Sequence, residues 1–319
     1  MINIIEECRD AKTIGISGHI KPDGDCIGST LALSLYLKKV FPEKHITVYS
    51  DDVSSAFDCV EGVQTFNNSY EGPDADVFIV IDTVENRIGN ADKFFKHAGK
   101  TINIDHHVSN TEGCGDVNYV VPTASSASEL VYELIDKKYM DTEIAEALYL
   151  GIAHDTGIFK YSNTSPKTMR IVAELLSYDF DFPTLLDKTF YEKTYEQNLA
   201  LGRILLESRR FLDGKVILGF MNIKTMTEMG ITSKDFDGVI NQLRITQGVE
   251  CAVFMYQMNA ETYKVSLRSK NIVDVSKIAV SFGGGGHVRA SGFYAKDTPE
   301  KLTEKLLQMI EEELKTENE

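Results

Sequence analysis

Several short apolar runs in the first half of the chain alternate with helical patterns, and this alternation restricts the fold more than any other feature. Runs that are apolar at nearly every position are typical of parallel strands that are covered on both faces. The alternation predicts an α/β fold whose N-terminal part is a doubly wound, mainly parallel sheet. The predicted strands are residues 13–17, 45–50, 76–82 and 100–105, and the predicted helices are residues 26–39, 125–137 and 142–153.

Acidic and histidine residues gather where these elements end. His19, Asp23 and Asp25 follow the first strand. Asp82 closes the third strand, and residues 105–107 (Asp-His-His) close the fourth. The carboxyl ends of parallel strands meet at one edge of a sheet, so we expect these side chains to lie close together. Carboxylate and imidazole ligands suit manganese, magnesium or iron(II), and the pattern therefore predicts a metal site at this edge.

Each of these motifs also has a simpler interpretation. Taken alone, residues 22–24 (Pro-Asp-Gly) are more typical of a turn that leads into a helix, with an Asp carboxylate that accepts hydrogen bonds from the unpaired N–H groups of the first helical turn. Asp82 is compatible with a cap at a strand end and Asp105 with a turn. A fourth motif further along the chain, residues 155–157 (Asp-Thr-Gly), is compatible with the end of a helix. Coincidence is a weak explanation for four such motifs in one order, and the metal site is therefore the preferred interpretation.

The ordered motifs in residues 18–25, 82, 105–107 and 154–157 resemble those of the DHH phosphoesterase family. The resemblance implies two divalent ions, with manganese expected first and magnesium, cobalt or iron(II) as alternatives, and a shared hydroxide that attacks phosphorus. It also implies that Asp82 bridges the ions, that Asp105 orients the histidines and that His107 faces the substrate. The metal ligands implied in this way are His19, Asp23, Asp25, Asp82, His106 and Asp155, and the catalytic residues are Asp82, His107 and Asp105.

A glycine-rich segment near the C-terminus resembles a motif of the DHH-associated C-terminal domain. Residues 282–292 contain four consecutive glycines followed by His287. Consecutive glycines let backbone N–H groups approach an anion closely, and an imidazole adds a further donor. Arg268 matches the substrate-binding arginine of the family, and a guanidinium can hold a phosphate through two parallel hydrogen bonds. The predicted substrate-binding residues are Arg268, Gly284, Gly285, Gly286 and His287.

The segment 178–183 interrupts the helical pattern and is the candidate domain boundary. We expect a catalytic domain at residues 1–182, a helical linker at 183–210, and a smaller α/β substrate-binding domain at 211–319. The linker includes a helix predicted at 194–210. Two domains suit a chain of 319 residues, and the resemblance implies an active-site cleft between them.

Composition restricts the partners. A formal charge of −15 argues against a long nucleic-acid duplex, whereas a small or short anionic substrate is compatible with local cations. The five scattered cysteines lack a Cys-x-x-Cys spacing, which fits a reducing compartment. Neither a membrane span nor an export signal is evident. We therefore expect a cytoplasmic protein without a membrane partner. A homodimer is compatible with the sequence.

The resemblance is closest to the NrnA-type group of that family, in which oligoribonucleases also act on adenosine 3′,5′-bisphosphate (pAp). It implies hydrolysis of short single-stranded RNA to mononucleotides and removal of the 3′-phosphate of pAp. A hydrolase of pApA or cyclic di-AMP is the main alternative, and a nucleotide-binding protein without turnover is a third. A pyrophosphatase is disfavoured because no Ser-Arg-Lys-Lys cluster is present, and a RecJ-type exonuclease because the chain is short and acidic.

Overall fold

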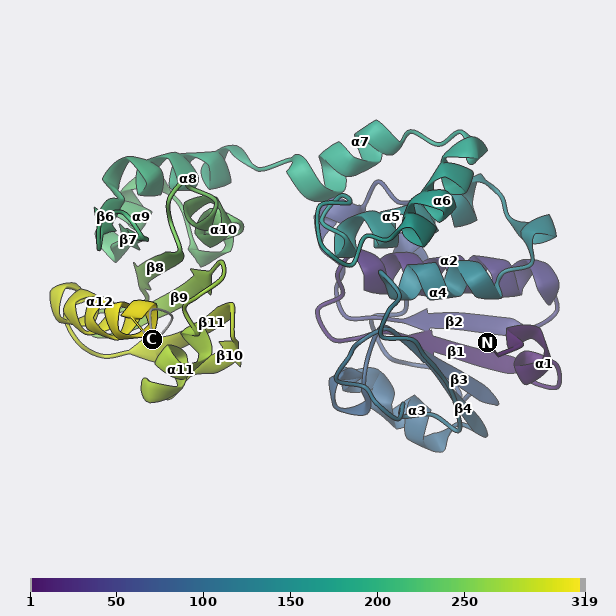
Figure 1. The fold of residues 1–319 in the computed structure, drawn as a ribbon. Coiled ribbons are helices and arrows are strands. Elements are labelled where there is room, and N and C mark those ends of the chain that lie inside the picture. The colour runs from purple at the N-terminus through teal and green to yellow at the C-terminus, as the bar shows by residue number, and fades with distance from the viewer. Residues whose placement is uncertain (1, 316–319) are drawn as a thin grey trace. The chain divides into compact units, whose positions relative to one another are not determined.

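The chain forms two compact units, Met1–Glu192 and Lys193–Glu319 (Figure 1). The structure, a computed structural model, describes residues 2–315. In each unit, helices pack against one β-sheet, and each unit has its own apolar core. No helix within residues 2–315 combines the length and the apolar character that crossing a bilayer requires.

The first unit contains a five-stranded sheet in the order β2-β1-β3-β4-β5, in which all neighbours are parallel. The predicted α/β fold with a parallel sheet is therefore confirmed. One strand, β5, was not predicted. The strands are β1 (Thr13–Ser17), β2 (His45–Tyr49), β3 (Val77–Ile81), β4 (Lys100–Asp105) and β5 (Val117–Val120).

Helices cover both faces of this sheet (Figure 1). On one face α2 (Gly24–Val40), α4 (Ala127–Leu134) and α5 (Thr142–Asp155) enclose the larger core with the buried isoleucines of the strands. On the other face, aromatic side chains of α3 (Asp92–His97) pack with Phe78. Because both faces are covered, the strands can be apolar at every position. The remaining helices are α1 (Ile4–Cys8), α6 (Pro166–Leu175) and α7 (Phe182–Leu186).

The boundary between the units lies after Glu192 rather than at residue 182. Leu185 of α7 is buried in the core of the first unit, and a π-helical turn (Asp187–Tyr191) follows it. Ala200, in contrast, belongs to a core of the second unit through α8 (Tyr195–Glu207). The predicted linker at 183–210 is therefore divided between the units, because apolar side chains anchor both of its parts.

The second unit contains a six-stranded mixed sheet in the order β10-β11-β9-β8-β7-β6. Only β7 and β8 are parallel. Arg209 and Arg210, predicted as the end of a helix, instead form strand β6. The elements are β6 (Arg209–Phe211), β7 (Val216–Met221), α9 (Ile223–Met229), α10 (Val239–Arg244), β8 (Cys251–Gln257), β9 (Tyr263–Ser269), α11 (Val275–Ser281), β10 (Gly285–His287), β11 (Ala290–Ala295) and α12 (Pro299–Lys315).

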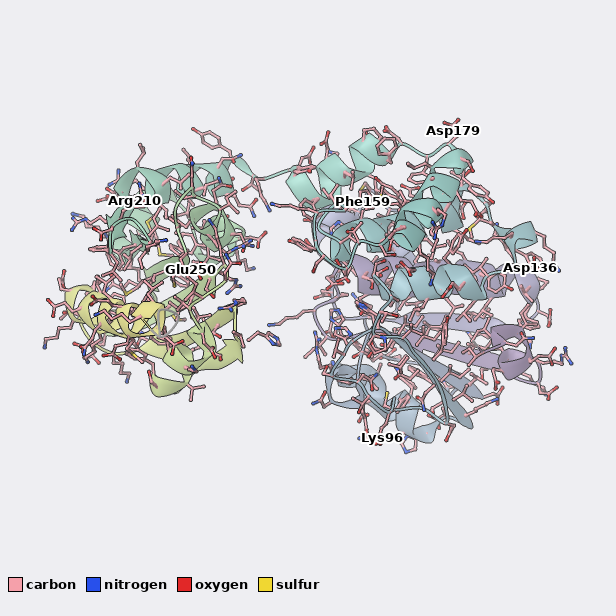
Figure 2. The ribbon with its side chains drawn as sticks, viewed as in Figure 1. Lys96, Asp136, Phe159, Asp179, Arg210 and Glu250 are labelled. Atoms are coloured by element: carbon pink, nitrogen blue, oxygen red, sulfur yellow. The ribbon has the colours of Figure 1, made fainter. Side chains whose placement is uncertain are left out.

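A buried carboxylate holds the turn that follows β9. Glu250, labelled in Figure 2, is 6% exposed, and its Oε1 atom accepts hydrogen bonds from the backbone N–H groups of three consecutive residues, Asn271, Ile272 and Val273. Several N–H donors stabilise a buried carboxylate that would otherwise be costly. This turn connects β9 to α11. Arg268 lies just before it in β9, where it pairs with residues of both β8 and β11.

Candidate active site

The N-terminus of α2 places two carboxylates in one turn. Oδ1 of Asp23 caps the helix by accepting from the N–H groups of Asp25 and Cys26, each at 3.1 Å. The side chain of Asp25 extends inward, where it accepts from the N–H groups of Ala127 and Ser128 at 2.6 and 2.9 Å. Asp23 therefore caps α2, as the sequence predicts. Because Ala127 and Ser128 lie at the start of α4, Asp25 also connects α2 to α4.

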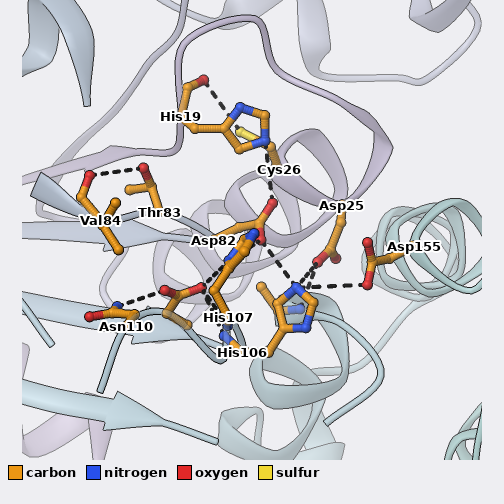
Figure 3. Close-up of polar contacts among 12 residues, drawn as sticks. His19, Asp25, Cys26, Asp82, Thr83, Val84, His106, His107, Asn110 and Asp155 are labelled. Atoms are coloured by element: carbon orange, nitrogen blue, oxygen red, sulfur yellow. Dashed lines mark hydrogen bonds and ion pairs between the residues drawn. The ribbon is translucent and has the colours of Figure 1, made fainter. Parts of the chain in front are cut away.

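Asp82 follows β3 directly and has a left-handed backbone, with φ of 58°. Its N–H donates to the carbonyl oxygen of Ile104 in β4 at 2.9 Å. A residue with a Cβ rarely adopts this conformation, and where it persists the surrounding structure supports it, often at functional sites. The turn directs the carboxylate toward histidines from two other elements (Figure 3).

The two oxygens of Asp82 face different histidines. Oδ2 lies 3.5 Å from Nε2 of His19, and that nitrogen also lies 3.5 Å from Asp23. Oδ1 lies 3.3 Å from Nε2 of His106. A carboxylate in this position can bridge two cations.

His106 in turn connects Asp82 to the second carboxylate group. Its Nε2 lies 3.8 Å from Asp25 and 3.7 Å from Asp155, the last residue of α5. Ligand atoms in each of three groups lie within 4.8 Å of one another and could hold a metal ion. These groups are His19, Asp23 and Asp82; Asp25, His106 and Asp155; and Asp82, His106 and His107. All six residues predicted as ligands therefore lie together.

The charge of this cluster fits a divalent cation. Asp25 is 1% exposed and Asp82 is 3% exposed, yet within residues 2–315 neither forms an ion pair with a lysine or an arginine. A buried carboxylate without a compensating cation is costly. Oxygen ligands with a few imidazoles suit manganese, magnesium or iron(II). The residues present thus fit the metals that the sequence predicts.

The histidines carry the positive charge that balances these carboxylates. Burial acts to lower the pKa of His19, but hydrogen bonds with Asp23 and Asp82 outweigh it and raise the pKa to about 10. Burial also opposes protonation of His106, whereas Asp82 and the nearby carboxylates raise its pKa to about 10. Bound metal would take over this role and displace the protons.

The carboxylates of the second group repel one another. Burial is the main cause that raises the pKa of Asp25 well above its ordinary value, and repulsion from Asp82 and Asp155 adds to it. Burial likewise raises the pKa of Asp155 to about 6. A cation bound among these groups would favour their ionised forms.

A hydrogen-bond network beside the cluster orients His107. Nδ1 of His107 lies 2.7 Å from Oδ1 of Asp105, which is fully buried. The other oxygen, Oδ2 of Asp105, accepts from the Asn110 amide at 2.6 Å, and that amide also donates to Asn103 at 2.9 Å. Asp105 is not in any of the three ligand groups, which agrees with the supporting role predicted for it. Asn103 and Asn110 were not predicted.

Asn163 supports the last ligand in a similar way. Its amide donates to the Oδ2 atom of Asp155 at 3.3 Å, to the backbone oxygen of Asp155 at 3.2 Å and to the backbone oxygen of Ser125 at 2.8 Å. This residue was also not predicted. Asparagines in loops, such as Asn110 and Asn163, are usually explained by turns, and Asn103 lies within β4. Only the tertiary structure shows that these three side chains lie next to the acidic cluster.

The predicted substrate-binding residues lie in the second unit. Ala290 of β11 pairs with both Arg268 of β9 and His287 of β10, so the two side chains lie in one row across the sheet. The N–H of Gly284 donates to the carbonyl oxygen of Ala279, and Gly285 opens β10. The glycines thus end α11 and begin a hairpin, and phosphate binding by their N–H groups stays a prediction.

Comparisons with known proteins agree with this architecture. Residues 13–152 match the model of the DHH family, N-terminal domain, and residues 213–316 match the DHHA1 domain. The chain is 30% identical over 298 residues to the bifunctional oligoribonuclease and PAP phosphatase NrnA of Bacillus subtilis, covering 91% of this chain and 92% of that protein. It is 32% identical to a probable protein of the same name from Streptococcus mutans, with 91% of each chain covered.

A solved structure shows the same fold. An exopolyphosphatase-related protein from Bacteroides fragilis aligns with a TM-score of 0.84 and 26% identity, covering 97% of this chain and 94% of that one. The fold, the acidic cluster and these relatives define a hydrolase that acts on phosphoester bonds. Both domain models and the two relatives cover most of the sequence. The chain belongs to the DHH phosphoesterase family.

Proposed function

We propose that this protein is a manganese-dependent phosphoesterase that hydrolyses short oligoribonucleotides to mononucleotides and removes the 3′-phosphate of pAp. The names of the relatives from Bacillus subtilis and Streptococcus mutans support this choice of substrates. The observation that carries the proposal is the position of Asp82, whose two oxygens face His19 and His106. One bridging carboxylate between two ligand groups is the arrangement that two-metal hydrolysis requires.

The proposed mechanism divides the work among residues of the first unit. Two divalent ions held there would supply positive charge and an activated water for attack on phosphorus. His19, Asp23 and Asp82 would hold one ion, and Asp25, Asp82, His106 and Asp155 would hold the other. His107, which is partly exposed and oriented by Asp105, would donate a hydrogen bond to a phosphoryl oxygen or to the leaving oxygen.

The proposal assigns substrate binding to the second unit. Arg268 and His287 lie in one row of the sheet, and both can bind a phosphate or the end of a nucleotide. Binding energy from a part of the substrate that does not react can position the scissile bond. We therefore expect substrates with a second phosphate or nucleotide to be preferred over small phosphodiesters.

A panel of substrates tests this function. The full-length protein with manganese would be assayed on pAp, a dinucleotide, RNAs of five and 24 nucleotides, cyclic di-AMP and pyrophosphate. Highest kcat/KM on pAp and the short RNAs supports the proposal. Preference for cyclic di-AMP would make the protein a cyclic-dinucleotide hydrolase, and binding without turnover would make it a nucleotide-binding protein.

A further inference from the structure

The second unit has a sheet face that its helices leave partly uncovered. The core cluster on this face contains residues of β7 and β8, among them Ile217 and Phe254, together with Leu243 of α10. It contains no residue of β9, β10 or β11. The opposite face of those strands is covered, because Leu267 and Phe293 pack there with residues of α11 and α12 (Figure 1). The uncovered part is therefore a strip along β9, β11 and β10.

Cations line this strip. Lys264 and Arg268 lie four residues apart in β9, with Ser266 between them on the same face, and this face points away from the covered side because Val265 and Leu267 are fully buried. At about 3.3 Å per residue, the two positions are about 13 Å apart along the strand. Arg244 ends α10, which packs against β9, and burial together with the like charge of Arg244 lowers the pKa of the Arg268 guanidinium. The strip thus carries three positive charges.

These cations have no acidic partner. Among the described residues, the side chains of Arg244 and Lys264 form neither an ion pair nor a hydrogen bond, and the Arg268 side chain donates only to the backbone oxygen of Leu267. In the whole sequence, 48 acidic residues outnumber 33 lysines and arginines. Three unpaired cations on one strip of such a protein indicate that an anion binds there.

An exposed aromatic ring lies on the same strip. Tyr294 of β11 is 59% exposed and pairs in register with Lys264. The Lys264 ammonium lies 4.1 Å from the centre of the Tyr294 ring, which is a cation–π contact. Between this pair and the Arg268 row lie Gly292 of β11 and the small side chain of Ser266 in β9, and the end of the Lys264 side chain lies over Gly292. Cations alternating with an aromatic ring on an open sheet are typical of surfaces that bind single-stranded nucleic acid.

We propose that this strip binds the nucleotides of an oligonucleotide that lie beyond its terminal phosphate. The inference rests on the proposed function, and it extends that function by naming the residues that recognise chain length. Arg244 and Lys264 take backbone phosphates, and a base stacks on Tyr294. The bound chain runs along β9, whose length from Arg268 to Lys264 spans more than one nucleotide. A pentamer held at Arg268 therefore has further nucleotides that can contact Tyr294, whereas pAp has a single nucleotide.

Binding by the full-length protein tests the inference without turnover. The affinities for a five-nucleotide RNA and for pAp are measured by calorimetry in the presence of chelator. In Tyr294→Ala we expect the ratio of pentamer affinity to pAp affinity to fall about tenfold, since one stacked base contributes that much. Lys264→Ala should also lower this ratio, because it removes a phosphate contact that only the pentamer makes. Tyr294→Phe, which keeps the ring, should retain the wild-type ratio. Lys277→Ala is the matched control, because Lys277 belongs to α11 on the covered side.

The outcomes separate the inference from the function. An unchanged ratio in both alanine variants, or an equal change in Lys277→Ala, overturns the inference. Thermal unfolding of each variant identifies a folding defect, and the Tyr294→Phe variant then decides whether the ring itself matters. The wild-type protein is also assayed for hydrolysis with manganese. Selective pentamer binding through Tyr294 without hydrolysis of either substrate would refute the function and leave the binding strip in place.

Discussion

Oδ1 of Asp82 lies 3.3 Å from Nε2 of His106, and the Asp82 backbone that holds it there has a φ of 58°. The two residues follow neighbouring strands, β3 and β4, which the N–H of Asp82 connects by donating to Ile104. The geometry of the cluster therefore depends on a backbone conformation as well as on side chains. A replacement that keeps the shape of Asp82 but removes its charge separates these two contributions.

Asp82→Asn should abolish turnover on every substrate, because an amide is a poor ligand for both ions and leaves them to repel each other. We expect a loss of at least about 1,000-fold in kcat/KM, which corresponds to about 4 kcal/mol. Manganese content would be measured by mass spectrometry in the same samples. Asp237→Asn is the control, since Asp237 is an exposed residue of the second unit. Activity within tenfold of wild type would refute the bridging role.

Asn110→Ala should lower kcat by about 10- to 100-fold while manganese content stays the same. The Asn110 amide holds Asp105, and Asp105 holds His107, so the change acts on the orientation of an imidazole. Asp105→Asn disturbs the same connection. We therefore expect the double variant to lose little more than the worse single variant. Additive losses would show that the two residues act independently.

Arg268→Ala should weaken catalysis on pAp and short RNA by about 2–4 kcal/mol in transition-state terms, because remote binding energy positions the scissile bond. A small aryl phosphodiester without a second phosphate should be hydrolysed with little change, and manganese binding should stay as in wild type. The measurement is kcat/KM on both kinds of substrate. Equal losses on both would place Arg268 at the metal centre or in folding.

Removal of the metal ions should abolish catalytic activity, and added manganese should restore it. Ligands that bind only the folded state at 100 to 1,000 times their Kd stabilise it by about 3–4 kcal/mol, or about 5–15 °C in Tm for a unit of this size. The pKa values of His19 and His106 are both raised to about 10, so binding displaces protons and manganese affinity should rise between pH 7 and 9. Titrations at both pH values with calorimetry check this. Full activity after exhaustive chelation would indicate a metal-free mechanism.

The lowered pKa of the buried His154 should make the stability of the first unit depend on pH. Burial lowers its pKa to about 4, between the rings of Phe57 and Phe190. The unfolded chain takes up this proton near pH 6.5, so the stabilisation is complete above that pH and is lost as the pH falls toward 4. The loss amounts to about 3 kcal/mol. The free energies of unfolding of wild type and His154→Gln, measured with urea, should therefore approach each other by that amount as the pH falls. Parallel pH profiles of the two proteins would contradict the lowered pKa of His154.

Much of the fold could be predicted because its strongest signals are local. Residues 13–17 and 100–105 form strands with the predicted bounds, since such apolar runs are stable only inside a covered sheet. β5 was missed because its four residues are half-buried or exposed. Arg209 and Arg210 were wrongly predicted as helix because no helix-breaking residue separates them from α8. Pairing with β7 decides their conformation, and that partner lies further along the chain.

The site shows the same division between local and tertiary signals. Asp82 and the triplet 105–107 end strands, which makes their convergence predictable from topology alone. Asn110 acts through a hydrogen bond to Asp105. Asn163 acts through a hydrogen bond to Ser125, which lies 38 residues before it in the sequence. No spacing rule predicts such contacts.

The acidic cluster and the cationic strip belong to units that have separate cores. A substitution at Tyr294 or Lys264 leaves the packing around Asp82 untouched, so natural variation can alter one unit without destabilising the other. Lineages that face different pools of RNA fragments could therefore diverge in the strip while their acidic cluster stays the same. Substrate preference in this architecture is expected to evolve faster than the chemistry, and swapping the second unit between relatives is a practical route to new length preferences.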